Sequence, residues 1–124
     1  MIDERITDGR RIAQLLASEL SGRESGALGT VAVVEANRDV EPAESGAFAY
    51  GIDADGDRLA DVSVHVDRAR IDLRAGLEAG ARAADEAGLR VRPKAVDPPR
   101  AIVFVESGAE VKRAVDAIVA AVGD

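Results

Sequence analysis

Apolar residues along the chain follow two different periods. In three segments they recur every three or four residues, which predicts amphipathic helices over residues 3–20, 67–88 and 107–122. The last helix is expected to begin with a capping box from Ser107 to Glu110 and to end before Gly123. Five further segments are continuously apolar or alternate between apolar and polar residues. They predict β-strands over residues 30–35, 47–53, 58–66, 89–95 and 101–105.

The segment 67–88 is predicted to be the central helix of the fold. Asp67 can cap its first turn, and Gly88 can adopt the left-handed conformation that ends a helix. Small residues recur at 75–76, 79–80 and 83–84, and they favour close approach of another backbone over a cofactor site. The apolar stripe of this helix would consist of Ala69, Leu73, Leu77, Gly80, Ala84 and Ala87.

A hairpin is predicted around Asp55 and Gly56, because this dipeptide between two alternating runs is a strong turn signal. A two-residue turn would place the bulky residues of 47–53 on the same face as the polar residues of 58–66. A three-residue loop, 54–56, followed by a bulge would instead place them with the valines. The second arrangement separates apolar from polar side chains better, so we expect it. The bulky residues in question are Phe48, Tyr50 and Ile52.

The predicted elements follow the order α-βββ-α-ββ-α. Because the connections within each group of strands are short, neighbouring strands are expected to be antiparallel. We therefore expect an α+β fold, a two-layer sandwich in which a five-stranded, mainly antiparallel sheet carries three helices. Residues 1–124 are expected to form a single domain, since no linker or change of composition divides them.

Composition excludes several classes of protein. The chain contains no cysteine, so disulfides, thiol catalysis and thiolate metal ligands are absent. No apolar run reaches the length of a membrane span, and the first residues are too charged for a signal peptide. These features predict a cytoplasmic protein with no membrane partner.

The balance of charges is unusual. The net charge is −7, and Lys94 and Lys112 are the only lysines among 16 basic residues. The stretches DERITDGRRIAQLLASEL and VAVVEANRDVEP resemble an uncharacterised haloarchaeal family of small acidic proteins. That resemblance implies a carboxylate-rich surface adapted to concentrated salt. It implies neither a catalytic residue nor a cofactor.

Acidic residues of the predicted hairpin form one candidate site. Asp53, Asp55 and Asp57 alternate along the chain, with Asp61 beyond them, and carboxylate oxygens are the ligands that Ca²⁺ prefers. The EF-hand pattern fails, however, because the loop glycine comes too early and no glutamate occupies the twelfth position. We therefore favour a solvated turn over a metal site.

A row of basic residues forms a second candidate site. Arg90, Arg92 and Lys94 alternate along one predicted strand, Arg100 follows the next turn, and His65 is expected nearby. Such a row can hold phosphate groups or a nucleic-acid backbone. No aromatic residues lie among the cations, so stacking on single-stranded bases is not favoured. The alternative is protection of an edge strand by charge, to which we give more weight.

The sequence as a whole predicts a non-enzymatic domain that acts as a homodimer or an interaction module and holds no cofactor. Small aliphatic residues bury less area than aromatic ones, so contact with a second copy would add to the core. The alternative is a binder of an anionic ligand, a nucleotide or a nucleic acid, through the basic row. A small enzyme that uses His65 with Asp61 or Tyr50 ranks last, since no nucleophile accompanies the histidine.

Overall fold

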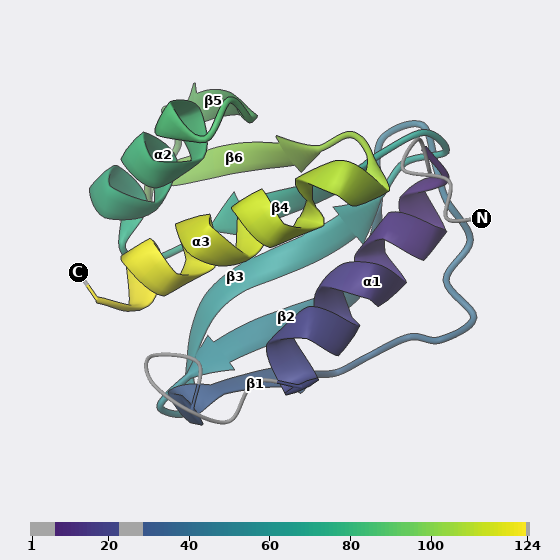
Figure 1. The fold of residues 1–124 in the computed structure, drawn as a ribbon, viewed down its shortest axis with the longest axis horizontal. Helices are drawn as coiled ribbons and strands as arrows, with labels where there is room; N and C mark the ends of the chain where they lie inside the picture. Colours follow the sequence, from purple (N-terminus) through teal and green to yellow (C-terminus); the bar gives the residue numbers. More distant parts are fainter. Residues whose placement is uncertain (1–6, 23–28, 124) are drawn as a thin grey trace.

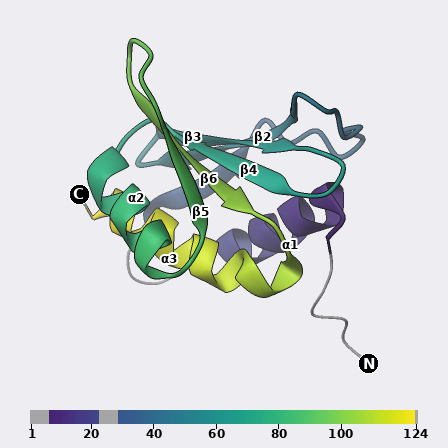
Figure 2. The same ribbon diagram turned by 90° about the horizontal axis from the view of Figure 1, so that it is seen from above.

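The computed structural model describes residues 7–22 and 29–123. In these ranges three α-helices cover one face of a six-stranded sheet, and the other face carries no helix (Figure 1, Figure 2). All strand neighbours are antiparallel, in the spatial order β1-β2-β3-β4-β6-β5. The elements are α1 (Gly9–Gly22), β1 (Val31–Val34), β2 (Ala47–Ala54), β3 (Asp57–Val64), β4 (Ala69–Leu73), α2 (Leu77–Glu86), β5 (Arg90–Lys94), β6 (Arg100–Val105), the 3-10 turn η2 (Gly108–Glu110) and α3 (Val111–Val122).

The prediction of a five-stranded sheet is wrong, because the first part of segment 67–88 is strand and not helix. It forms β4, which lies between β3 and β6, and α2 begins only at Leu77. Ala69, Ile71 and Leu73 are buried beneath the helices. Ala69 and Leu73 satisfy a helical and a strand period alike, but Ile71 satisfies only the strand period. The element order is therefore α-ββββ-α-ββ-α.

Close approach of another backbone to the small residues of α2 is confirmed. A Cβ atom added at Gly76 would overlap the backbone of Ala121 in α3, and one added at Gly80 would lie 3.2 Å from the Ala121 Cβ. Gly88 ends α2 as predicted, with φ +84° and its N–H donating to the carbonyl oxygen of Asp85. α2 and α3 thus pack side by side on the sheet (Figure 1).

The β2–β3 hairpin has a two-residue turn, so the expected three-residue loop is wrong. Ala54 pairs directly with Asp57, and Asp55 and Gly56 both have positive φ, 52° and 84°. Positive φ at both central positions is the conformation that best suits the twist of a hairpin. The turn therefore obeys the local preference of the Asp-Gly dipeptide.

Two register irregularities along this hairpin still place most bulky residues on the helix side. One shift, between Ile52 and Asp53, sets Tyr50 opposite Val62 in the core. A second shift, between Phe48 and Tyr50, turns Phe48 to the helix-free face, where it is 41% exposed. A β-bulge changes the face of every residue beyond it, and the turn length alone could not predict this.

α1 begins at Gly9, and not at the predicted residue 3. Residues 7 and 8 are not helical, and the Asp8 carboxylate caps the helix by accepting from the Arg10 N–H over 3.0 Å. Residues 3–6 of the predicted helix lie outside the described residues. The Gly9 N–H donates to the Val66 carbonyl over 3.1 Å, and a Cβ here would overlap backbone carbonyls of the β3–β4 turn. Gly9 therefore holds the start of α1 against that turn.

The capping box predicted at Ser107 is wrong. The Ser107 side chain makes no capping hydrogen bond, and η2 precedes α3. The Glu110 carboxylate does reach back, but it accepts from the Glu106 N–H, over 2.8 Å. The start of α3 is thus tied to the end of β6.

The core lies between the sheet and its three helices. The hydroxyl of buried Tyr50 donates to the Ala13 carbonyl over 2.8 Å, which joins β2 to α1. Within the described residues, none of the helices has both the length and the apolar character needed to cross a membrane. The largest fully buried side chains include those of Ile12, Leu16, Leu20, Ile52, Ile71, Leu73 and Ile118.

Candidate anion-binding surface

The helix-free face of the sheet carries charged side chains that lie in register. Residues paired directly across antiparallel strands share a face, so their side chains form rows perpendicular to the strands. One row consists of Gly51, Asp61, Asp72, Ile102 and Arg92, and the next consists of Ser63, Arg70, Phe104 and Arg90.

Asp61 lies at the centre of an ion-pair cluster on this face. Its carboxylate accepts from Arg58 Nη1 over 2.6 Å and lies 2.5 Å from Arg74 Nη2, while only 8% of the residue is exposed. Arg58 also donates to Asp53 over 2.9 Å and pairs with Glu35. These acceptors, Asp61 first, raise the pKa of the Arg58 guanidinium above its ordinary value. Arg58 is therefore a structural cation, committed to its three carboxylates.

Phe104 is covered by two guanidinium groups. The Arg90 and Arg68 guanidinium carbons lie 4.7 and 5.5 Å from its ring centroid, and the residue is only 6% exposed. Arg90 also pairs with Glu106 over 3.2 Å. In the next strand, Arg70 donates to Asp72 over 2.8 Å. Arginine side chains thus shield the helix-free face from water in place of a second layer of helices.

The four predicted basic residues of the β5–β6 hairpin do lie together. Arg90, Arg92 and Lys94 share one face of β5, and Arg100 of β6 is paired directly with Lys94. This is the helix-free face, and the tip of the hairpin extends beyond the sheet on that side (Figure 2). Arg92, Lys94 and Arg100 form no ion pair with any residue that the structure describes. We call these three residues the hairpin cations.

His65 is not part of this basic row. It follows the end of β3, while the hairpin cations lie toward the opposite end of the neighbouring strands. Its Nδ1 lies 2.9 Å from the Glu44 carbonyl oxygen, and the residue is buried. Tyr50 belongs to the helix side of the sheet and Asp61 to the other. The structure therefore does not assemble these three residues into one catalytic site.

The acidic residues of the β2–β3 turn do not converge either. Asp53 is engaged by Arg58, and Asp55 and Asp57 are exposed at the turn. Across residues 7–22 and 29–123, no group of three histidine or carboxylate side chains is placed to hold a metal ion.

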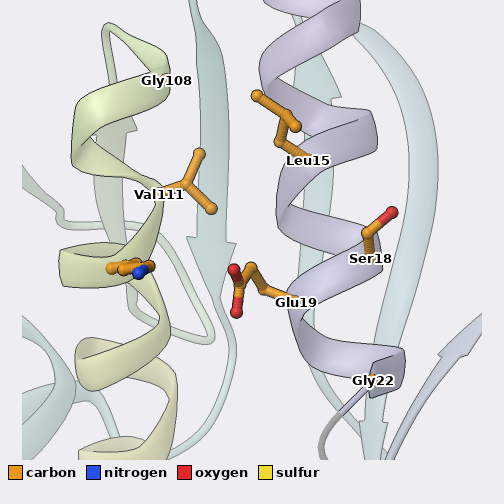
Figure 3. A pocket seen from close by; sticks show the side chains of 7 residues that line it. Leu15, Ser18, Glu19, Gly22, Gly108 and Val111 are labelled. Carbon is orange, nitrogen blue, oxygen red and sulfur yellow. The ribbon is translucent and has the colours of Figure 1, made fainter. Parts of the chain in front are cut away.

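Two hollows lie beside α1. The first, about 320 Å³, is bounded by α1 and α3, and Figure 3 shows Leu15 and Val111 near its apolar end and Glu19 directed toward α3. The second, about 550 Å³, lies between α1, β1 and the loop after β1, with Tyr50 in its lining. Neither hollow contains a cluster of titratable side chains comparable with that of the sheet face.

The Asp61 cluster was not predicted, although the sequence contains a signal for it. Arg70, Asp72 and Arg74 alternate with buried apolar residues, as expected for the open face of a strand. On a helix, Arg74 would lie one turn from Glu78. The partner that it actually contacts, Asp61, lies on the neighbouring strand.

These features define an antiparallel α+β domain with helices on one face, an arginine-rich opposite face and a basic hairpin at one edge. The chain belongs to a family of unknown function, DUF7993, which matches residues 1–124. Membership of an uncharacterised family agrees with the resemblance found in the sequence. No curated protein and no solved structure matches the chain.

Proposed function

We propose that this protein is a non-enzymatic binding domain that attaches to the phosphate backbone of nucleic acid through the β5–β6 hairpin. The observation that carries the proposal is the set of hairpin cations without carboxylate partners. In a chain of net charge −7, nearby arginines such as Arg58, Arg70 and Arg74 are all ion-paired. Three neighbouring cations without partners on one face are available to an external anion.

The arrangement of these cations favours a polymer over a single phosphate group. Residues two apart on a strand are separated by about 6.8 Å, so Arg92 and Lys94 spread their charge along β5. Arg100 extends the row onto β6. Convergent donors would suit one small anion, whereas a line of cations suits successive phosphates of a backbone.

Edge protection does not account for the whole row. β5 is an edge strand, and Arg92, Pro93 and Lys94 would discourage pairing with another strand. Arg100, however, lies on β6, which already has a neighbour on each side. Its position on the same face as the β5 cations is better explained by a shared ligand.

The test is fluorescence anisotropy with a short labelled DNA duplex and its single strand, over a range of salt concentrations. Replacing Arg92, Lys94 and Arg100 with serine should weaken binding at least about tenfold. It should also reduce the slope of log K against log salt by about 2 to 3, because up to three phosphate contacts are lost.

A matched control variant separates the effect of the hairpin cations on binding from the effect of net charge. Replacing Arg82, Lys112 and Arg113 with serine changes the net charge equally, from −7 to −10, but on the helices. This control should retain wild-type affinity and slope. Equal losses in both variants, or no binding of the wild type at low salt, would contradict the proposal. Binding of free phosphate but of neither DNA would also contradict it.

Salt adaptation is a further part of the proposal, supported by the excess of acidic residues and the near absence of lysine. Repulsion between exposed carboxylates is screened by salt, so the midpoint of urea unfolding should rise with KCl concentration into the molar range. A midpoint that is independent of salt, or that falls, would remove this part.

Self-association is a second candidate property, independent of the hairpin. The observation that favours it is the contrast between the two edges of the sheet. β5 is protected by charge and proline, whereas β1 has the sequence Val-Ala-Val-Val and carries neither.

A further inference from the structure

In the part of the chain that the structure describes, the outer edge of β1 has no neighbouring strand. The Asp55 N–H donates to the Thr30 carbonyl over 3.0 Å, and hydrogen-bonded pairs alternate along antiparallel strands. In this register Ala32 and Val34 direct their backbone groups toward β2. Val31 and Val33 therefore direct their N–H and C=O groups outward, where no described residue pairs with them.

This edge is complementary to itself. If a second copy of β1 lies antiparallel to the first, with Ala32 opposite Ala32, then Val31 of each copy is opposite Val33 of the other. Each such pair exchanges two hydrogen bonds, so the four outward groups of one copy meet the four of the other. A twofold contact of this kind uses the same residues on both chains, so the assembly ends at two copies.

The hollow beside β1 is lined by no carboxylate, which favours another copy of an acidic chain over a basic partner. The C-terminal half of α1 lies next to β1 (Figure 1). Gln14, Ala17, Ser18 and Ser21 of this helix border the 550 Å³ hollow, and the charged residues of its lining are Arg10 and Arg38. Glu35, which follows β1, is paired with Arg58. Two chains of charge −7 can therefore meet here without bringing unpaired carboxylates together.

The small side chains of α1 make room for the second copy. Pairing of two short strands alone buries little area, and stable interfaces need more. With the β1 strands joined, the α1 helices of the two copies come to the same side of the sheet. Ala17, Ser18 and Ser21 then allow them to pack closely over the hollow.

We propose that two copies of this chain pair through β1 about a twofold axis at Ala32, which forms a continuous twelve-stranded sheet flanked by the two α1 helices. The pairing does not depend on nucleic-acid binding by the hairpin, which lies at the opposite edge.

Cysteine cross-linking tests the register, because the native chain has no cysteine. Directly opposed, non-hydrogen-bonded residues have Cα atoms about 4.5 Å apart, within the range of a disulfide. Ala32→Cys should therefore form a covalent dimer under mild oxidation, at protein concentrations where Ala109→Cys, exposed in η2, stays monomeric. Absence of this cross-link would overturn the register.

Two variants of opposite charge at Ala32 test the interface in solution. By sedimentation at micromolar concentration and at about 0.15 M salt, where like charges still repel, the wild type should be a dimer. Ala32→Glu and Ala32→Lys should each weaken self-association at least about tenfold, because like charges then face each other across the axis. An equimolar mixture of the two should recover a dimer, while Ala109→Glu should behave as wild type.

A monomeric wild type, or a dimer unchanged by both Ala32 variants, would overturn the proposal. If the two charged variants lose their circular dichroism signal of folding, the cross-link of Ala32→Cys decides the question by itself. Loss of nucleic-acid binding in the hairpin variant leaves the expected dimer mass unchanged, so the two proposals fail separately.

Discussion

Arg58 and Asp61, three residues apart on β3, are joined by a 2.6 Å hydrogen bond on the face of the sheet that has no helix. Because Asp61 is almost fully buried, its removal takes one of three carboxylates from Arg58 and takes from Arg74 its only ion-pair partner among the described residues. Asp61→Ala should lower the free energy of unfolding by about 2 to 4 kcal/mol in urea titrations. Asp67→Ala, which breaks an exposed pair with Arg68, should cost at most about 0.5 kcal/mol. Equal losses would mean that the Asp61 cluster is no more important than a surface pair.

The two end residues of α1 provide a matched pair of glycine substitutions. Gly9→Ala should destabilise the protein by at least about 2 kcal/mol, because the new methyl group would overlap the carbonyl oxygens of His65 and Arg68. Gly22→Ala meets open space and should be neutral or stabilise by up to about 1 kcal/mol through helix propensity. Thermal unfolding of both variants checks this, and a tolerated Gly9→Ala would contradict the close contact between α1 and the β3–β4 turn.

Substitutions at the two central positions of the β2–β3 turn should have opposite effects on stability. Gly56→Ala should cost about 1 to 2 kcal/mol, because an L-residue is strained at φ +84° although nothing surrounds it. Asp55→Asn should be neutral or slightly stabilising, since asparagine tolerates φ 52° well. Urea midpoints measure both. A neutral Gly56→Ala would contradict the positive φ at this position.

Ionisation of the Tyr50 phenol should lower the stability of the protein at alkaline pH. Burial raises the pKa of its phenol above the ordinary value of about 10, so the folded state holds the proton more tightly than the unfolded state. The stability that this provides is complete below pH 10 and falls by about 1.4 kcal/mol per pH unit above it. Tyr50→Phe should lose about 1 kcal/mol near pH 7, where the hydrogen bond to Ala13 is missing. The difference between the two proteins should then shrink as the pH rises, and a constant difference would contradict the shift.

The sequence predicted most elements well, but it failed where one segment satisfied two periods. In segment 67–88 the helical stripe and the strand share Ala69 and Leu73, and Gly88 supported one long helix. Ile71 was the residue that could have decided the question, because a large β-branched side chain outside the stripe would be exposed on a helix. It is buried on β4 instead. That one error removed a strand from the expected sheet.

The sequence predicted the basic row of the candidate site. It did not predict which cations of the row lack carboxylate partners, or that His65 lies away from them. Alternation placed Arg90, Arg92 and Lys94 on one face, and a short turn placed Arg100 beside them. Which cations have carboxylate partners depends on strand order, and a single sequence does not contain that information. The pairing of Arg90 with Glu106 and the distance of His65 from the row therefore became visible only in three dimensions.

The hydrogen bond from Tyr50 to Ala13 also has a practical consequence. Tyr50 is the only tyrosine, and the chain has no tryptophan, so its near-ultraviolet absorbance and fluorescence arise almost entirely from this one ring. The ring lies where α1 meets β2, beside the edge at which we place the second copy. Its spectrum is therefore an intrinsic, label-free reporter of whether the first helix stays docked when the chain dimerises, unfolds or is moved between salt concentrations.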